Sequence, residues 1–337
     1  IKYPGDTDTA IIRRAQWIEG AKKEEGNLDW WGILSPGEGS KVIAEFNKIY
    51  PFIKVDYWRG SPVEIEGRVG AEYAAGRLRA DIILGVETYN YSNWRKIGML
   101  EKFTDFIPGL KKMDKRMSSK HHERCMPGNN VSIPTYNTKI VGTAEAPKNW
   151  EDLLEPKWKR QIAVQPVVTP WYTLALAEGG WGIKKTEDFL ARLKQQQPIY
   201  VSSYSSGHAL MVAGEAKIMS TGFWTHVMTS QDKGAPCEWV KANPLAVTGP
   251  SFILQKKALH ANASRLFLEW LFSPQGLIAY DNVTYYGVVF PGSGTRAAKA
   301  AEGLNLAVRT EETVQQAIEL GLIDRFQEIL GISKGVK

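Results

Sequence analysis

The chain of 337 residues lacks the features that define several protein classes. Its only two cysteines, Cys125 and Cys237, lie far apart, so there is neither a Cys-x-x-Cys motif nor a zinc pattern. Whether these thiols stay free or form one disulfide is left open by the sequence. No apolar stretch approaches the roughly 20 residues that a transmembrane helix requires. With 43% hydrophobic residues, the chain can instead form a sizeable core, and a largely disordered state is excluded.

The chain also lacks a concentrated block of one charge. Lys and Arg together number 42 and Asp and Glu 36, for a net charge of +6. The densest basic stretch, residues 111–124, is interrupted by Asp114 and Glu123. A nucleic-acid-binding protein would gather its basic residues in a stripe or arm, so no nucleic-acid partner is predicted. The modest positive excess favours an acidic small molecule as ligand.

Motifs for catalysis and for common cofactors are missing as well. The segment Pro291-Gly292-Ser293-Gly294 does not fit the Gly-x-Ser-x-Gly frame of α/β hydrolases, and no glycine-rich nucleotide-binding loop occurs. None of the five histidines has the spacing of a metal-binding helix motif. We therefore predict no catalytic residue, no metal ligand and no cofactor. A secreted hydrolase of α/β architecture is a less favoured alternative.

Strand and helix patterns alternate along the chain. Strands are expected at 28–34, 53–58 and 80–85, and helices at 42–50 and 62–75, which is the β-α-β-α-β order of an open, doubly wound, mostly parallel sheet with helices on both faces. A second series of alternating strands and helices, later in the chain, predicts a second lobe. Further helices are expected at 9–25, 150–154, 171–178, 186–195, 206–213, 263–272, 297–302 and 310–330, and strands at 162–165, 199–201 and 216–220. Two strand-like segments, around 239–240 and 251–254, could return to the first sheet.

Ligands of open α/β sheets bind beyond the carboxyl ends of the strands, where helix N-termini present free N–H groups. The residues at those ends combine hydroxyls, aromatic rings and one arginine, a mixture suited to a small polar or anionic molecule. Arg59 could equally form a salt bridge at the rim of the site. The candidate ligand-binding residues are Ser35, Arg59, Glu87, Thr169, Trp171, Ser205, Phe223 and Trp224.

Several segments, in family order, resemble the solute-binding proteins of ABC transporters of the ferric-iron type. They are residues 147–159 (PKNWEDLLEPKWK), 80–83 (ADII), 136–139 (YNTK), 214–216 (GEA) and 267–276 (FLEWLFSPQG). The resemblance implies a two-lobe type II periplasmic-binding-protein clamshell, with lobes 1–132 plus 246–290 and 133–245 plus 291–337. It further implies a monomer that closes around a solute in its cleft and delivers it to an inner-membrane ABC permease. The resemblance also implies a secreted, mature periplasmic form. The start at Ile1 without an apolar leader would fit a removed signal peptide, but any trimmed chain would start in the same way.

Iron-binding members of that family use a histidine, a glutamate and a pair of tyrosines. The corresponding positions here are Ser35, Val86 (with Glu87 next to it) and 222–225, which contains Phe223 and Trp224 and no phenol. Ferric ion requires anionic oxygen ligands, so bare Fe³⁺ is not the predicted ligand. We predict a small organic anion with a carboxylate or phospho group, held by Thr169, Trp171 and Ser205, with Arg59 as charge partner and Phe223 and Trp224 as a ring wall. Ferric iron or a metal chelate is the alternative.

Overall fold

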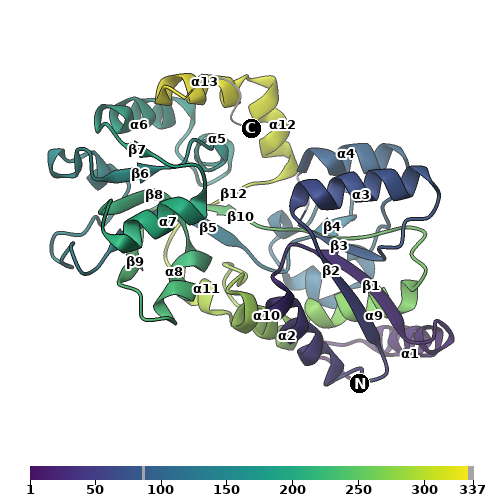
Figure 1. Ribbon diagram of the computed structural model, residues 1–337. Helices are drawn as coiled ribbons and strands as arrows, with labels where there is room; N and C mark the ends of the chain where they lie inside the picture. Colours follow the sequence, from purple (N-terminus) through teal and green to yellow (C-terminus); the bar gives the residue numbers. More distant parts are fainter. Residues whose placement is uncertain (86–87, 333–337) are drawn as a thin grey trace. The chain divides into compact units, whose positions relative to one another are not determined.

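The computed structural model describes residues 1–85 and 88–332 and divides the chain into two compact units (Figure 1). Unit 1 comprises residues 1–129 and 249–300, and unit 2 comprises residues 130–248 and those from 301 onward. The chain leaves unit 1 for the last time after residue 300, ten residues later than the predicted boundary at 290/291. Residues 291–300 stay in unit 1 because they form hydrogen bonds within it: the Thr295 hydroxyl donates to the Val288 carbonyl, and the Arg296 N–H donates to Asp281.

Unit 1 contains a five-stranded sheet in the order β2-β1-β3-β11-β4. β1 is parallel to both β2 and β3, whereas β11 runs antiparallel to β3 and β4. The strands are β1 (Asn27–Gly32), β2 (Lys54–Arg59), β3 (Ile82–Leu84), β4 (Arg124–Cys125) and β11 (Phe252–Leu254).

The helices of unit 1 enclose an aromatic core around Phe267, whose ring centroid lies 5.3 Å from that of Trp30 and 5.0 Å from that of Phe46. A buried ion pair attaches the first helix to α9, with Arg14 Nε 2.6 Å from Glu269 Oε2. The helices are α1 (Asp8–Lys23), α2 (Pro36–Asn47), α3 (Pro62–Ala74), α4 (Thr88–Lys96), α9 (Ala261–Leu271), α10 (Pro274–Thr284) and α11 (Arg296–Ala300), with 3-10 turns η1 (Thr104–Phe106), η2 (Pro108–Lys112) and η3 (Lys115–Met117).

Unit 2 contains a seven-stranded mixed sheet in the order β12-β10-β5-β8-β6-β7, with β9 paired to β5. β5 is antiparallel to β8, β9 and β10, and the remaining pairs are parallel. The strands are β5 (Asn130–Asn137), β6 (Ile162–Val164), β7 (Ile199–Tyr200), β8 (Ile218–Phe223), β9 (Cys237–Trp239), β10 (Leu245–Thr248) and β12 (Leu306–Val308).

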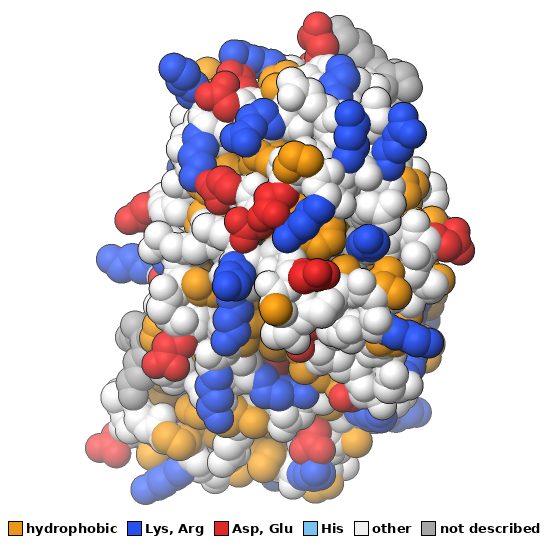
Figure 2. Space-filling view, turned by 90° about the vertical axis from the view of Figure 1, so that its left-hand side faces the viewer, with side chains coloured by type: hydrophobic (Ala, Val, Ile, Leu, Met, Phe, Trp, Pro, Cys, Tyr) orange, Lys and Arg blue, Asp and Glu red, His pale blue; other side chains and the backbone are white. Residues whose placement is uncertain are grey.

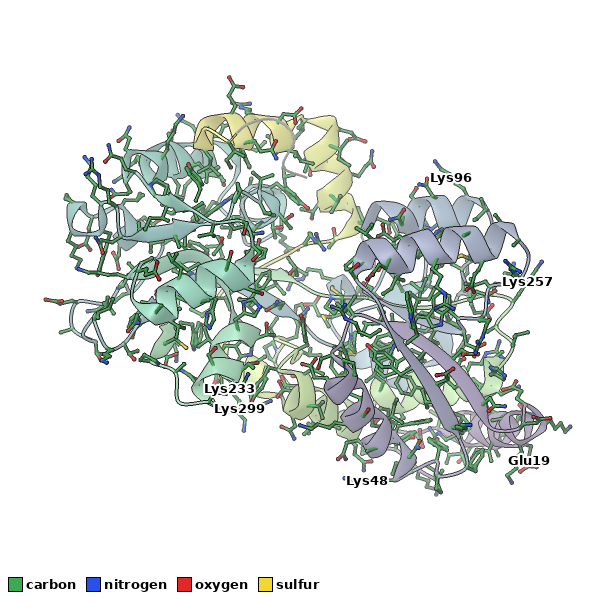
Figure 3. All side chains as sticks on the ribbon, viewed as in Figure 1. Glu19, Lys48, Lys96, Lys233, Lys257 and Lys299 are labelled. Carbon is green, nitrogen blue, oxygen red and sulfur yellow. The ribbon has the colours of Figure 1, made fainter. Side chains whose placement is uncertain are left out.

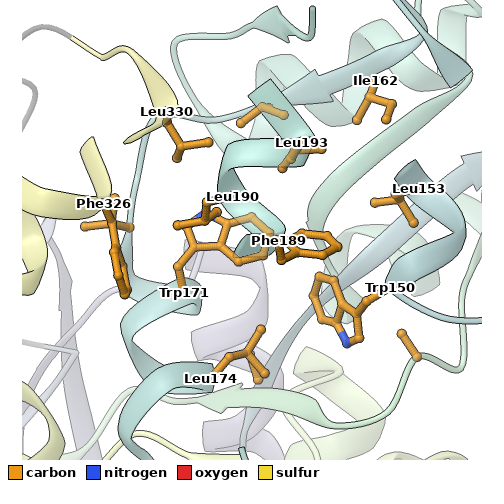
Figure 4. Close-up of a cluster of buried hydrophobic side chains, with 14 of the residues drawn as sticks. Trp150, Leu153, Ile162, Trp171, Leu174, Phe189, Leu190, Leu193, Phe326 and Leu330 are labelled. Atoms are coloured by element: carbon orange, nitrogen blue, oxygen red, sulfur yellow. The ribbon is translucent and has the colours of Figure 1, made fainter. Parts of the chain in front are cut away.

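Helices pack against this second sheet over two apolar clusters. The larger one joins Trp150, Trp171, Phe189 and Phe326 (Figure 4), and the smaller one contains Met211, Met219 and Val227. The helices are α5 (Thr169–Leu176), α6 (Ile183–Gln195), α7 (Tyr204–Ala213), α8 (Trp224–Gln231), α12 (Glu311–Glu319) and α13 (Leu322–Leu330), with 3-10 turns η4 (Glu151–Leu154) and η5 (Pro156–Trp158).

The α/β prediction is confirmed, and several elements differ in detail. The single helix expected over 310–330 is wrong, because Gly321 in a left-handed conformation (φ 63°) separates α12 from α13. Of the two late strand-like segments, only 252–254 joins the first sheet, whereas β9 pairs with β5 in unit 2. Strands β4, β5, β10 and β12 and helices α4, α8 and α10 are additional to the predicted elements. Both cysteines are buried free thiols.

Two surface properties bear on the predictions made from charge and hydropathy. On the face shown in Figure 2, Lys and Arg side chains are interspersed with Asp and Glu, and the described surface there has no continuous basic stripe. Within the described ranges, no helix combines the length and the apolarity needed to cross a membrane.

Candidate functional site

In unit 1, the helices that follow β1 and β2 begin with carboxylate caps. At α2, the Glu38 N–H donates to Ser35 Oγ (3.3 Å) while the Ser35 N–H donates to Glu38 Oε2 (2.8 Å). Ser61 and Glu64 form the same reciprocal pair at α3, with distances of 3.3 and 2.7 Å. Each box satisfies N–H groups of the first turn and places a negative charge there. The Ser35 side chain, predicted as a ligand contact, is thus already engaged in capping.

Arg59 is the last residue of β2, and its side chain is exposed. The structure records no hydrogen bond or ion pair between its guanidinium and the described residues. The pKa of the neighbouring Glu64 lies below its ordinary value, chiefly because this carboxylate accepts the Ser61 N–H and the Ser61 hydroxyl, and the charge of Arg59 lowers it further. Glu87, the third candidate of this unit, lies outside the described residues.

In unit 2, the helices after β6 and β8 begin without a side-chain cap. Val168 precedes α5 and Phe223 precedes α8, and neither side chain caps the helix that follows it. At the start of α5, the structure records no acceptor among the described residues for the N–H groups of Thr169 and Trp171. The Thr169 side chain is half-buried beside these groups. Free N–H groups at a helix start form a ready binding position for an anion.

Trp171 contributes to this position through its backbone alone. Its indole is fully buried, with its ring centroid 5.8 Å from that of Trp150 and 5.7 Å from that of Phe189 (Figure 4). The helical twist therefore turns the side chain into the core while the N–H stays at the first turn. The buried ring thus packs in the core of unit 2, and the N–H is the part of Trp171 that lies at the helix start.

The start of α7 is capped by hydroxyls rather than by a carboxylate. The Ser206 N–H donates to Ser203 Oγ (3.0 Å), and the Ser203 N–H donates to Ser206 Oγ (3.0 Å). Ser205, the predicted contact, is exposed between them, and its hydroxyl makes no recorded hydrogen bond with the described part of the chain. This helix start therefore carries no negative charge of its own.

Phe223 and Trp224, whose aromatic rings are predicted to form one wall of the ligand site, have different environments. Phe223 is half-buried and stacks on Tyr204, with ring centroids 4.0 Å apart and planes 30° apart. Trp224 is only 7% exposed and meets Trp239 edge-on at 5.3 Å. Phe223 thus belongs to an aromatic pair with Tyr204, whereas Trp224 is mainly part of the core.

Tyr204, Tyr172 and Arg309 lie close together and are absent from the predicted set. Burial raises the pKa of the Tyr204 phenol, the charge of Arg309 opposes this rise, and Tyr172 adds to it. Tyr172 lies on α5, three residues after Thr169. Arg309 directly follows β12, and its N–H donates to the Val247 carbonyl (2.8 Å). Because β12 is not among the predicted strands, no sequence signal marked Arg309 as a residue at a strand end.

Asp29, Asp81 and His260 of unit 1 have potential ligand atoms within 4.8 Å of one another. Their interactions are already satisfied within the protein. Asp81 Oδ2 accepts the Asp29 N–H (2.8 Å) and lies 2.7 Å from His260 Nδ1, while Oδ1 accepts the His260 N–H (3.0 Å). Arg79 lies 3.0 Å from Asp29 Oδ1. This trio is a structural network that joins β1, the start of β3 and the segment before α9.

Comparison with known proteins places this architecture in a family. Residues 41–305 match the family model described as bacterial extracellular solute-binding protein, and the chain belongs to that family. A curated relative, an uncharacterized protein of Haemophilus influenzae, is 30% identical over 150 residues, which are 43% of this chain and 42% of the relative. The match thus spans less than half of that relative's length.

Solved structures of periplasmic binding proteins have the same fold. The periplasmic binding protein P5PA is 21% identical with a TM-score of 0.63, covering 88% of this chain and 99% of its own. Iron-bound HitA of Pseudomonas aeruginosa is 15% identical (TM-score 0.65, 91% and 99% covered). AfuA of Actinobacillus pleuropneumoniae, with fructose-6-phosphate bound, is 18% identical (TM-score 0.65, 92% and 100% covered). The predicted resemblance to solute-binding proteins of ABC transporters, with the type II periplasmic fold, is confirmed.

Proposed function

We propose that this chain is the periplasmic solute-binding component of an ABC importer and that it captures a small organic anion bearing a carboxylate or phospho group. The observation that carries the proposal is the uncapped start of α5 in unit 2, a helix whose Tyr172 interacts electrostatically with Tyr204, as Arg309 does. Closure of the two units around the ligand, a monomeric state and delivery to an inner-membrane permease are parts of the same proposal.

Each part of the anion has a group suited to it. The N–H groups of Thr169 and Trp171 and the Thr169 hydroxyl donate to the anionic oxygens, and the helix dipole adds to the attraction. Arg309 supplies a planar guanidinium that can form two parallel hydrogen bonds with a carboxylate or phosphate. The stacked rings of Phe223 and Tyr204 offer an apolar surface to the remainder of the ligand.

The ligands named for two related structures favour an organic anion as the ligand of this chain, with a metal chelate as the second candidate. AfuA is described with fructose-6-phosphate, which carries a phospho group, and HitA with iron. Bare Fe³⁺ needs anionic oxygen ligands, whereas burial raises the pKa of Tyr204 and so disfavours its phenolate. An iron–carboxylate chelate would bring its own anionic oxygens and could use the same N–H groups.

The proposal is tested by isothermal titration with inorganic phosphate, sugar phosphates, mono- and dicarboxylates, ferric citrate and free Fe³⁺. We expect an organic anion to bind, and Arg309→Gln to weaken it about tenfold or more because a charged hydrogen-bond partner is lost. Lys233→Gln is the control, since Lys233 is an exposed residue of unit 2 whose side chain points outward (Figure 3). Saturable binding of Fe³⁺ alone, or equal affinities of wild type and Arg309→Gln, would contradict the proposal.

A further inference from the structure

Two histidines of unit 2 face each other across neighbouring helices. His208 lies on α7 and His226 on α8, with ring centroids 5.5 Å apart and ring planes 52° apart. His208 is only 8% exposed, and His226 is half-buried. They lie 18 positions apart in the sequence, so no helical spacing motif indicated the pair.

A hydrogen bond fixes the orientation of His208. Its Nε2 lies 2.7 Å from Ser230 Oγ, and Ser230 is four residues after His226, on the same face of α8. In the tautomer that carries its proton on Nε2, this N–H donates to Ser230 Oγ, and His208 Nδ1 has a free lone pair. A histidine that binds a metal is held in this way, with one ring nitrogen hydrogen-bonded and the other bare.

Nδ1 of His208 and Nδ1 of His226 are both buried and lack a hydrogen-bond partner among the described residues. A buried polar atom without a partner is costly, so two adjacent ones require an explanation. Burial lowers the pKa of both histidines, that of His208 to about 4 with a further contribution from His226, which keeps the imidazoles neutral near pH 7. Neutral imidazole nitrogens are available as metal ligands.

The spacing of the rings fits a shared ion. A tetrahedral ion ~2.1 Å from one nitrogen of each imidazole places the two ring centroids ~5 Å apart. The observed 5.5 Å agrees with this arrangement. The Asp29–Asp81–His260 trio differs, because its oxygens already accept hydrogen bonds from the protein.

We propose that His208 and His226 bind one borderline transition-metal cation of the Zn²⁺ type, with water or a small anion completing its coordination. Imidazole nitrogen favours such cations over Mg²⁺ or Ca²⁺, which prefer oxygen. The site would connect α7 to α8 next to Phe223, whose ring meets that of His226 edge-on at 5.5 Å. Neither histidine is among the residues proposed to hold the anion.

The test uses the full chain freed of metal with a chelator and titrated with Zn²⁺ and Co²⁺. We expect one equivalent of Zn²⁺ by calorimetry and, with Co²⁺, the visible absorption bands of a tetrahedral ion. His208→Gln and His226→Gln should each lose both signals, whereas His122→Gln, at an exposed histidine of unit 1, should keep them. Near-ultraviolet circular dichroism shows whether each variant is folded.

Should the buried variants misfold, nitrogen NMR of the wild type replaces them. Zn²⁺ should then shift the Nδ1 resonances of His208 and His226 and leave those of His122 unchanged. Absence of binding to the wild type, or binding that survives in both folded variants, overturns the proposal. Organic-anion binding measured with chelator present is independent of this result, so failure here leaves the proposed function intact.

Discussion

The helices that follow β1 and β2 in unit 1 start differently from those that follow β6 and β8 in unit 2. In unit 1, Glu38 and Glu64 fold back onto the starts of α2 and α3 and place a carboxylate at each first turn. In unit 2, α5 and α8 begin without any side-chain cap, and α7 is capped by serine hydroxyls alone. The compared helix starts therefore differ in charge: those of unit 1 hold a carboxylate and those of unit 2 do not. A helix start that already holds a carboxylate repels a second anion.

This difference assigns separate roles to the candidate residues. Ser35 is a capping residue in unit 1, and the Glu38 carboxylate beside it makes that end of β1 unfavourable for an anion. Thr169 and the N–H of Trp171 lie at an uncapped helix start in unit 2, and Tyr204, which interacts with Tyr172 of the same helix, also interacts with the cationic Arg309. We therefore expect unit 2 to bind the anionic group of the ligand. Substitutions at the helix starts of both units test this contrast.

Trp171→Ala separates the two parts of this residue, the ring in the core and the N–H at the helix start. Removing a fully buried indole should lower the free energy of unfolding of unit 2 by about 3–5 kcal/mol. Urea unfolding followed by circular dichroism measures the loss. Full stability combined with abolished anion binding would show instead that the ring itself contacts the ligand.

Thr169→Asp gives α5 the kind of carboxylate that α2 and α3 already possess. Anion affinity should fall about tenfold or more because the new charge competes for the same N–H groups, while stability is kept or slightly raised. Isothermal titration with an organic anion that binds the wild type measures the affinity. Thr169→Asn, of the same size and uncharged, is the matched control, and an equal loss in both variants would refute the role of charge.

Ser35→Ala removes a cap from unit 1. The loss of the α2 cap should cost about 1 kcal/mol of stability, with anion affinity unchanged. Chemical denaturation and calorimetry on the same sample give both values. A drop in affinity without a drop in stability would make Ser35 a ligand contact after all.

Acid should weaken the α3 cap selectively. Because the Ser61 N–H and hydroxyl lower the pKa of Glu64, the carboxylate stabilises the fold above its ordinary pKa of 4.5, and this contribution is lost as the pH falls through the lowered value. The protection factors of the first-turn amides of α3, which correct hydrogen exchange for its intrinsic pH dependence, should therefore fall between pH 6 and pH 3. Glu64→Gln should remove this pH dependence while keeping the cap, and an unchanged profile would contradict the sign.

The alternation of strands and helices could be predicted from the sequence because apolar periodicity and turn residues reflect local physics. The positions of Thr169 and Phe223 at strand ends followed from that alternation. The capping boxes also have a local signature, since Ser35 and Ser61 each precede a glutamate by three residues. Val168, which precedes α5, has no such partner, so the contrast between these helix starts is itself encoded in neighbouring residues.

Other parts of the site depend on long-range packing and could not be predicted. The inward rotation of Trp171 is set by its contacts with Trp150 and Phe189, which are remote in sequence. The place of Arg309 depends on the pairing of β12 with β10, about 60 positions earlier in the chain. The His208–His226 pair needs α7 and α8 to pack side by side, which no local pattern encodes.

An amide NMR titration of the wild-type chain with inorganic phosphate, the simplest anion of the predicted class, asks directly which unit holds the anion. We expect the largest shifts on the N–H groups of Thr169 and Trp171, while those of Glu38 and Glu64 stay in place. Shifts concentrated at Glu38 and Glu64, or no saturable shift at Thr169 and Trp171, would contradict anion binding by unit 2.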